Sequence, residues 1–116
     1  MHELSIAKNI IEIVEEHARE LNASVVAELE LDIGTVSGVI PETLEFVMDI
    51  AAKDTVLEGS KIIINIIQAK AQCKNCSKDF EMDDIYTMCP HCGSLQFDII
   101  QGKELKVKAI RIPDNS

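Results

Sequence analysis

The sequence has no long apolar run. The longest apolar stretch, residues 62–67, is interrupted by Asn65 and has the length of a strand, far below the about 20 residues that a membrane-spanning helix needs. Residues 1–20 carry Glu and Lys throughout and contain no continuous apolar segment, so we expect no secretory signal. The sequence therefore predicts a soluble, cytoplasmic protein that does not bind membranes.

The common catalytic signatures are also missing. The sequence contains no P-loop, no GxGxxG, no GxSxG and no HExxH. Its paired carboxylates, Glu15-Glu16 and Asp83-Asp84, are better explained as solvated faces, because acidic side chains are rarely buried. We therefore predict that the protein is not an enzyme.

Basic residues are scarce, with 11 Lys and Arg against 20 Asp and Glu and a formal net charge of −9. Such a chain repels phosphate backbones, which argues against a nucleic-acid partner. Lys70, Lys74 and Lys78 lie around the first of two cysteine pairs. We interpret these three lysines as local counter-charge to metal-bound thiolates.

Cysteine occurs only in two CxxC pairs, which twelve residues separate. Each CxxC turn directs two thiolates at one ion, so two such turns are typical of a structural zinc site. The predicted zinc ligands are Cys73, Cys76, Cys89 and Cys92. A site closed by four thiolates has no open position for substrate or water, which again disfavours catalysis.

Three alternatives to zinc can be weighed for these cysteines. Two disulfides are disfavoured in a reducing cytosol. A thioredoxin-type redox pair would leave the second CxxC unexplained. Iron stays open, since four-thiolate sites accept either metal and the segment from Cys89 to Gly93 resembles one rubredoxin knuckle.

Apolar spacing predicts two helices. Residues 4–21 place apolar side chains at helical intervals with charged residues mostly elsewhere, the pattern of an amphipathic helix. Pro41 fits the first position of a second helix, whose apolar stripe contains Leu44, Val47 and Met48.

Three strands are predicted around these helices. Residues 25–33 alternate between apolar and acidic side chains, as in a half-buried strand. Residues 62–67 are nearly all apolar and β-branched, which is typical of a central strand. A final strand begins at Leu105, and a phase shift near Ile110 indicates a bulge.

This order predicts an α+β fold with two layers, in which two helices cover one face of a three-stranded sheet. A four-cysteine zinc-ribbon lobe is inserted between the last two strands, which we expect to be neighbours. The α/β domain is then discontinuous, comprising residues 1–69 plus 102–116, and the zinc-binding domain comprises residues 70–101. The lobe has too few apolar residues to fold without a metal. They are Phe80, Met82, Ile85, Tyr86, Leu95 and Phe97.

The three histidines differ in context. His17 lies among charged residues of the first helix, and His91 lies inside the second knuckle, where a loop role is the simpler reading. His2 follows Met1, which we expect to be retained because histidine is bulky. The α-amine of Met1, the backbone nitrogen and imidazole of His2, and the amide of Glu3 offer a planar set of nitrogens suited to Ni(II) or Cu(II). Because any chain can begin with Met-His, the pattern alone leaves an accidental histidine open.

Several motifs taken together resemble the HypA family, the nickel-delivery accessory proteins of [NiFe]-hydrogenase maturation. The resemblance covers nearly the whole chain. It rests on the segments Met1–Ser5, Ile33–Val39 followed by Pro41, Leu44 and Phe46, Glu58-Gly59, Gly102–Val107 and the two cysteine pairs.

The resemblance implies a nickel metallochaperone. His2 would bind the transferred Ni(II) together with backbone nitrogens of Met1 and Glu3, and the four cysteines would hold structural Zn(II). The implied partners are a nickel-loading maturation GTPase and the hydrogenase large subunit, and in some members the urease accessory proteins. The residues alone also leave open a zinc-ribbon interaction adaptor without transferable metal and a rubredoxin-like electron carrier.

Overall fold

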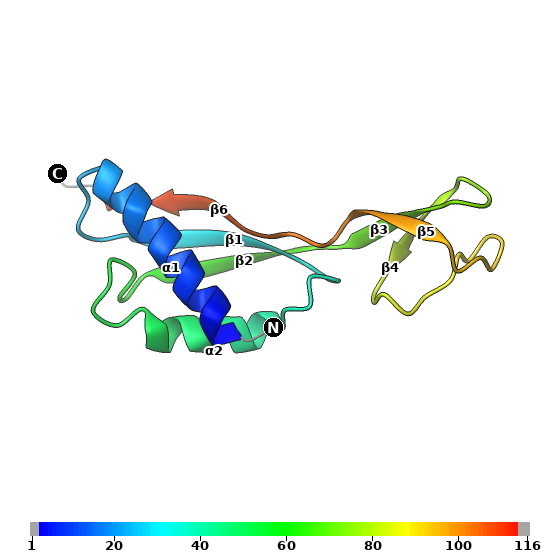
Figure 1. Ribbon diagram of the computed structural model, residues 1–116. Coiled ribbons are helices and arrows are strands. Elements are labelled where there is room, and N and C mark those ends of the chain that lie inside the picture. Colours follow the sequence, from blue (N-terminus) through cyan, green and yellow to red (C-terminus); the bar gives the residue numbers. More distant parts are fainter. Residues whose placement is uncertain (1–2, 114–116) are drawn as a thin grey trace.

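The computed structural model describes residues 3–113, which form two helices and two separate three-stranded sheets. The first half contains α1 (Glu3–Glu20), β1 (Glu28–Gly34), α2 (Pro41–Ala51) and β2 (Lys61–Ile67). The second half contains β3 (Ala69–Cys73), β4 (Asp79–Met82), β5 (Phe97–Gln101) and β6 (Leu105–Arg111). Figure 1 shows α1 and α2 against the first sheet, with the second sheet extending away from them. Within residues 3–113, no helix is long and apolar enough to cross a membrane.

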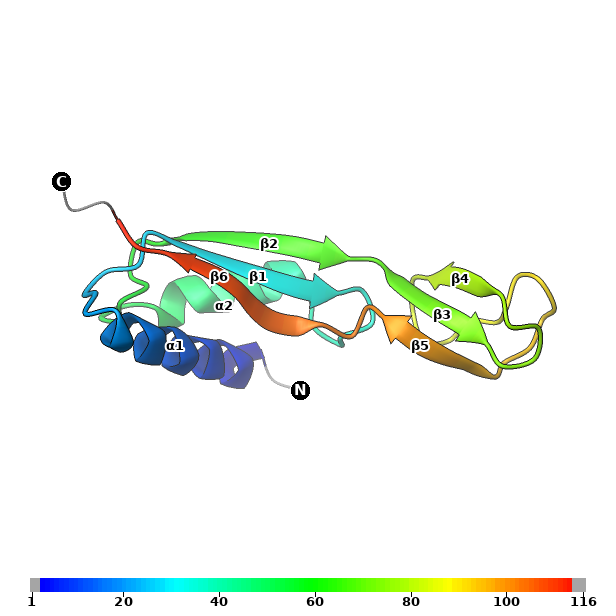
Figure 2. The same ribbon diagram turned by 90° about the horizontal axis from the view of Figure 1, so that it is seen from above.

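The first sheet has the strand order β2-β1-β6. β1 and β2 are parallel and joined by α2, whereas β6 returns from the second sheet and pairs with β1 in the antiparallel direction. Figure 2 shows both helices on the same side of this sheet, which confirms the predicted two-layer arrangement. Two expectations about the strands were wrong: residues 62–67 lie at an edge rather than in the centre, and β2 and β6 are not neighbours, because β1 lies between them.

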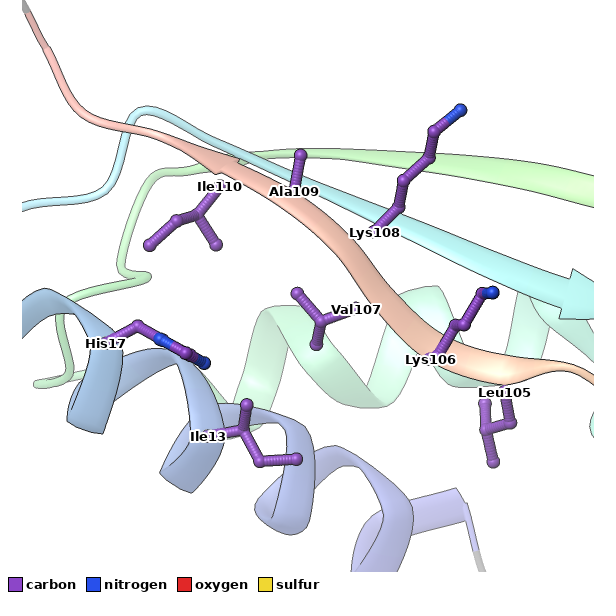
Figure 3. A pocket seen from close by; sticks show the side chains of 8 residues that line it. All are labelled: Ile13, His17, Leu105, Lys106, Val107, Lys108, Ala109 and Ile110. Atoms are coloured by element: carbon purple, nitrogen blue, oxygen red, sulfur yellow. The ribbon is translucent and has the colours of Figure 1, made fainter.

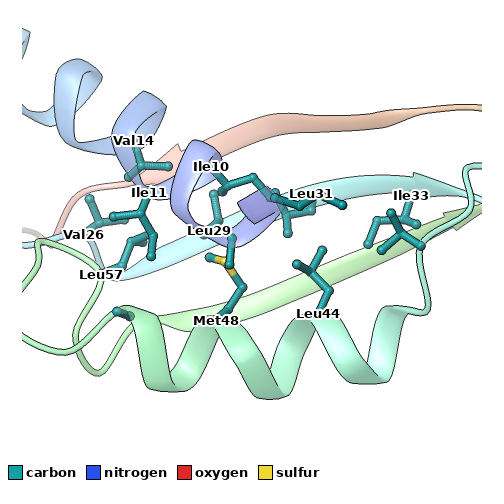
Figure 4. Packing of buried hydrophobic residues seen from close by; sticks show 14 of the residues in the cluster. Ile10, Ile11, Val14, Val26, Leu29, Leu31, Ile33, Leu44, Met48 and Leu57 are labelled. Carbon is teal, nitrogen blue, oxygen red and sulfur yellow. The ribbon is translucent and has the colours of Figure 1, made fainter. Parts of the chain in front are cut away.

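The central strand β1 alternates its side chains between the two faces of the sheet. Its apolar residues Leu29, Leu31 and Ile33 point at the helices and are almost completely buried. Its acidic residues alternate with them on the other face, where Asp32 is also buried and accepts a hydrogen bond from the Asn65 side chain. Figure 4 shows these side chains packed against Leu44 and Met48 of α2. The core of the molecule therefore lies between β1 and the two helices.

The bulge predicted near Ile110 lies slightly earlier in β6. Glu30 pairs with Ala109 and Leu31 with Val107, so Lys108 is the extra residue on that strand. The extra residue brings the Lys108 Nζ to 3.6 Å from a carboxylate oxygen of Glu30 on the open face.

Two short connections, which pack closely against the chain around Gly34, join the sheets. β2 runs into β3 through Gln68, and β5 returns to β6 through residues 102–104. A Cβ on Gly34 would overlap the backbone of Gly102, and a Cβ on Gly102 would overlap Ala69. The Thr35 hydroxyl accepts a hydrogen bond from the Ala69 amide at 3.0 Å. Neither Gly34 nor Gly102 has room for a side chain, so this junction requires glycine at both positions.

The second sheet, in the order β4-β3-β5, was not predicted from the sequence. Of the apolar residues assigned to the lobe, Phe80 and Met82 are buried, and Phe97 lies edge-on to Phe80 with ring centroids 5.6 Å apart. The other three apolar residues of the lobe, Ile85, Tyr86 and Leu95, are exposed. Their place is taken by small side chains of β3 and by two of the cysteines.

Candidate metal centre

The four cysteines come from two turns at the far end of the second sheet. Cys73 is the last residue of β3, and Cys76 lies in the turn that leads to β4. Cys89 and Cys92 lie in the connection between β4 and β5. Both ribbon views place these turns at the end of the molecule remote from α1 (Figures 1 and 2).

The four sulfur atoms converge on one point. All of them lie within 4.8 Å of one another. The Sγ atoms of Cys73 and Cys92 are 3.5 Å apart, and those of Cys76 and Cys89 are 3.6 Å apart. Four sulfurs at about 2.3 Å from a tetrahedral ion lie about 3.8 Å from one another. The spacing therefore fits a single tetrahedral ion, and no disulfide joins these cysteines.

The two turns have the same backbone geometry. In the first, the carbonyl of Cys73 accepts a hydrogen bond from the Ser77 amide at 3.0 Å. In the second, the carbonyl of Cys89 accepts one from the Gly93 amide at 2.7 Å. Ser77 and Gly93 both have positive φ, at 65° and 79°. The left-handed residue after each CxxC turns the chain back, so that both sulfurs of the pair point inward.

Backbone amides are directed at the sulfurs. The amides of Asn75 and Cys76 donate to the Cys73 Sγ at 3.3 and 3.4 Å, and the His91 amide donates to the Cys89 Sγ at 3.4 Å. The bond from the Cys76 amide is the main cause that lowers the pKa of the Cys73 thiol to about 6. Hydrogen bonds to sulfur favour the thiolate, which is the metal-binding form.

When no metal ion is present, the closeness of the four sulfur atoms opposes ionisation of all four thiols. For Cys76, a backbone hydrogen bond from Lys78 favours the thiolate, but burial and the neighbouring sulfurs outweigh it and raise the pKa to about 11. A divalent metal ion would remove this conflict by neutralising the sulfurs. The donor set, its spacing and its amide hydrogen bonds therefore fit a zinc ion.

The other predicted residues lie in different places. Met1 and His2 lie outside the described residues, so the nickel ligands stay a prediction; Glu3 begins α1. His17 is exposed on α1, as expected, 3.8 Å from Glu20. Of the three lysines read as counter-charge, Lys74 pairs with the Asp98 carboxylate at 3.5 Å.

One contributor to the metal centre was missed. The Asn75 side chain lies 3.7 Å from the Cys92 Sγ and connects the first turn to the exposed cysteine of the second. The position of Asn75 inside the first CxxC was visible in the sequence, but a contact between the two turns depends on how they are placed in space.

Known proteins resemble this chain along almost its whole length. The hydrogenase maturation factor HypA of Parabacteroides distasonis is 52% identical over 112 residues, which cover 97% of both chains. That of Francisella philomiragia is 42% identical over 95% of this chain and 97% of its own. The solution structure of the Ni metallochaperone HypA from Helicobacter pylori has the same fold, with a TM-score of 0.69 over 97% of each chain at 24% identity.

The fold and the metal centre define a metal-binding protein with an α/β layer and a small, zinc-ribbon-like lobe. Residues 1–112 match the family described as "Hydrogenase/urease nickel incorporation, metallochaperone, hypA". The chain belongs to this HypA family of nickel metallochaperones. Membership confirms the resemblance and the predicted metallochaperone function, and it places the chain among proteins that are not enzymes.

Proposed function

We propose that this protein binds Ni(II) at its amino terminus and helps deliver it to the [NiFe]-hydrogenase large subunit, while its four cysteines hold a structural zinc ion. The assignment of the two metals to different sites rests on the four sulfur atoms, which lie within 4.8 Å of one another. Because the cysteines form a complete tetrahedral set, they are suited to hold an ion permanently, and the transferred ion needs another site.

The zinc ligands in this proposal are Cys73, Cys76, Cys89 and Cys92. Zinc is favoured by the four-sulfur donor set and by amide hydrogen bonds to two of the sulfurs. Two of the cysteines are buried in the small core of the lobe, so zinc would stabilise the second sheet directly.

The nickel ligands in this proposal are the His2 imidazole and the backbone nitrogens of Met1, His2 and Glu3. Nitrogen donors in a square plane suit Ni(II), and they release it when protons or other ligands compete. α1 begins at Glu3, and this end of the helix points towards the middle of the molecule (Figure 2). The cysteine turns lie at the opposite end of the second sheet, so the two metals would be held apart.

The proposal also assigns two domains, the partner proteins and the cellular location. Residues 1–69 plus 102–116 form the nickel-binding domain, and residues 70–101 form the zinc-binding domain; the two separate sheets support this division. The partners are a nickel-loading maturation GTPase, the hydrogenase large subunit and urease accessory proteins. Thiolates that must stay reduced favour the cytoplasm as the location.

The amino-terminal assignment is tested by replacing His2. We expect His2→Ala to lose the Ni(II) ion, about one per chain, while zinc content and the circular dichroism spectrum stay unchanged. His17→Ala is the matched control, because His17 is an exposed histidine in the last turn of α1. Metal content is measured after equilibration with both ions. Equal nickel binding by the two variants would contradict the assignment.

A further inference from the structure

A groove of about 490 Å³ runs along β6, between this strand and α1. Figure 3 shows its apolar floor, formed by Ile13 of α1 and by Val107 and Ile110 of β6, with His17 towards one end and Leu105 at the other. Ile13 is 45% exposed although it is a large apolar residue. The groove is thus an apolar surface that the described chain does not cover.

The strand that borders the groove is open on one side. In the order β2-β1-β6, β6 pairs with β1 only, and its other edge has no partner strand among residues 3–113. An open strand edge beside a helix is the geometry in which extended peptides add to a sheet. Backbone hydrogen bonds then supply affinity, and alternate side chains enter the groove between strand and helix.

The charges beside β6 indicate the chemistry of the added strand. Lys106 and Lys108 line the groove along with the apolar residues. On the side already paired, β1 opposes them with the alternating segment Glu28–Ile33, in which Asp32 pairs with Lys106 and Leu31 with Val107. A strand on the free edge would meet the same alternation of basic and apolar residues, and opposite charges across strands stabilise pairing.

We propose that this groove receives an extended segment of a partner protein, in which acidic and apolar residues alternate, as an additional strand on β6. The proposal goes beyond nickel and zinc binding and does not depend on which residues hold either metal. The apolar side chains of the segment would contact Ile13 and Val107, and a carboxylate of the segment would lie beside Lys106.

A second copy of this chain fits the edge poorly. Pairing of β6 with β6 would bring Lys106 and Lys108 of both copies together, and like charges across strands are destabilising. The acidic alternating segment of the chain itself lies in β1, which is already paired on both sides. The partner is therefore a different protein.

The bulge at Lys108 limits the contact. It interrupts the regular ladder of β6, so we expect pairing along residues 105–107. Leu105, at this end of the groove, lies towards the beginning of α1 (Figure 3). A short pairing there would be weak and reversible, and it would bring the partner to the end of the helix from which the amino terminus emerges.

The test uses the zinc-loaded full chain, labelled with ¹⁵N, and a capped peptide with the sequence of residues 28–33. We expect chemical-shift changes in β6 and the adjoining face of α1, and weaker binding at high salt. Ile13→Glu should abolish these changes, whereas Ile50→Glu, which alters an exposed isoleucine of α2, should not. Lys106→Glu should weaken binding roughly fivefold, and the exposed Lys53→Glu should leave it unchanged.

A second peptide, with lysine at its three acidic positions, tests the charge argument and should not bind. Thermal unfolding of each variant establishes that the fold is retained, and Lys106→Glu keeps the test decisive if Ile13→Glu does not fold. Equal binding of both peptides, or shift changes outside β6 and α1, would overturn the proposal. Concentration-dependent association of the chain with itself through β6 would also overturn it.

Discussion

The left-handed residue that ends each cysteine turn leads to a pair of opposite predictions. Gly93 has φ 79° and Ser77 has φ 65° at the same position of the two turns. Gly93→Ala places a side chain in a conformation that L-residues disfavour, whereas Ser77→Gly removes one from it. We therefore expect the first change to weaken the zinc lobe and the second to strengthen it.

The magnitude follows from two opposing terms. A left-handed conformation destabilises the folded state of an L-residue by about 1–2 kcal/mol. Replacing glycine by alanine also lowers the conformational entropy of the unfolded chain, which stabilises the folded state by about 0.4–1 kcal/mol. No atom lies within 4 Å of a Cβ on Gly93, so no clash is added. The net cost of Gly93→Ala is therefore about 1 kcal/mol. Ser77→Gly should stabilise the lobe by somewhat less than this. It relieves the left-handed strain, but the new glycine increases the conformational entropy of the unfolded chain.

Zinc affinity is the appropriate assay, because folding of the lobe and metal binding are linked. A cost of about 1 kcal/mol weakens apparent zinc binding about fivefold, measured by competition with a chromophoric chelator at fixed pH. Ser77→Gly should tighten binding by about twofold. Changes of the same sign in both variants, or unchanged affinity for Gly93→Ala, would refute the assignment of strain to these positions.

Three further predictions concern the rest of the molecule. In thermal denaturation, Gly102→Ala should lower the free energy of unfolding by more than about 3 kcal/mol, because the new Cβ would overlap Ala69. Gly59→Ala is the control and should lower it much less, because a Cβ there meets no atom within 4 Å. Equal losses of stability in the two variants would contradict the close crossing at Gly102. A hydrogen bond from Asn65 is the main cause that lowers the pKa of the Glu30 carboxyl below its ordinary 4.5. The ionised Glu30 therefore stabilises the fold at pH values above 4.5. This stabilisation is lost as the pH falls through the lowered pKa of Glu30. Urea denaturation of Glu30→Gln should therefore show a smaller loss of stability on acidification than the parent, and parallel pH profiles would exclude this role. Zinc removal by a chelator should abolish amide protection in β3, β4 and β5 but preserve it in α1 and β1, and simultaneous loss in both sheets would contradict separate folding of the lobe.

Much of the α/β layer could be predicted because periodicity reports burial. The apolar spacing of α1 and the alternation in β1 correspond to the faces that the structure buries. The position of β2 could not be predicted in this way. Its run of isoleucines has the composition of a doubly covered strand, but α2 places it on one side of β1 and the returning chain places β6 on the other. Composition does not show which side of β1 the last strand occupies.

The metal centre was predictable as a set of residues but not as a structure. The CxxC spacing identifies the four sulfurs that converge. The matching turns at Ser77 and Gly93 and the contact from Asn75 depend on backbone conformation and on how the two turns face each other. The β3, β4 and β5 strands escaped prediction because they are short and contain many polar residues.

The central claim, that the two metals occupy different sites with different donors, is tested most directly by X-ray absorption at the zinc and nickel edges of the doubly loaded protein. The account predicts zinc surrounded by four sulfurs at about 2.3 Å and nickel surrounded only by nitrogen and oxygen. Sulfur in the nickel shell, or fewer than four sulfurs around zinc, would contradict it.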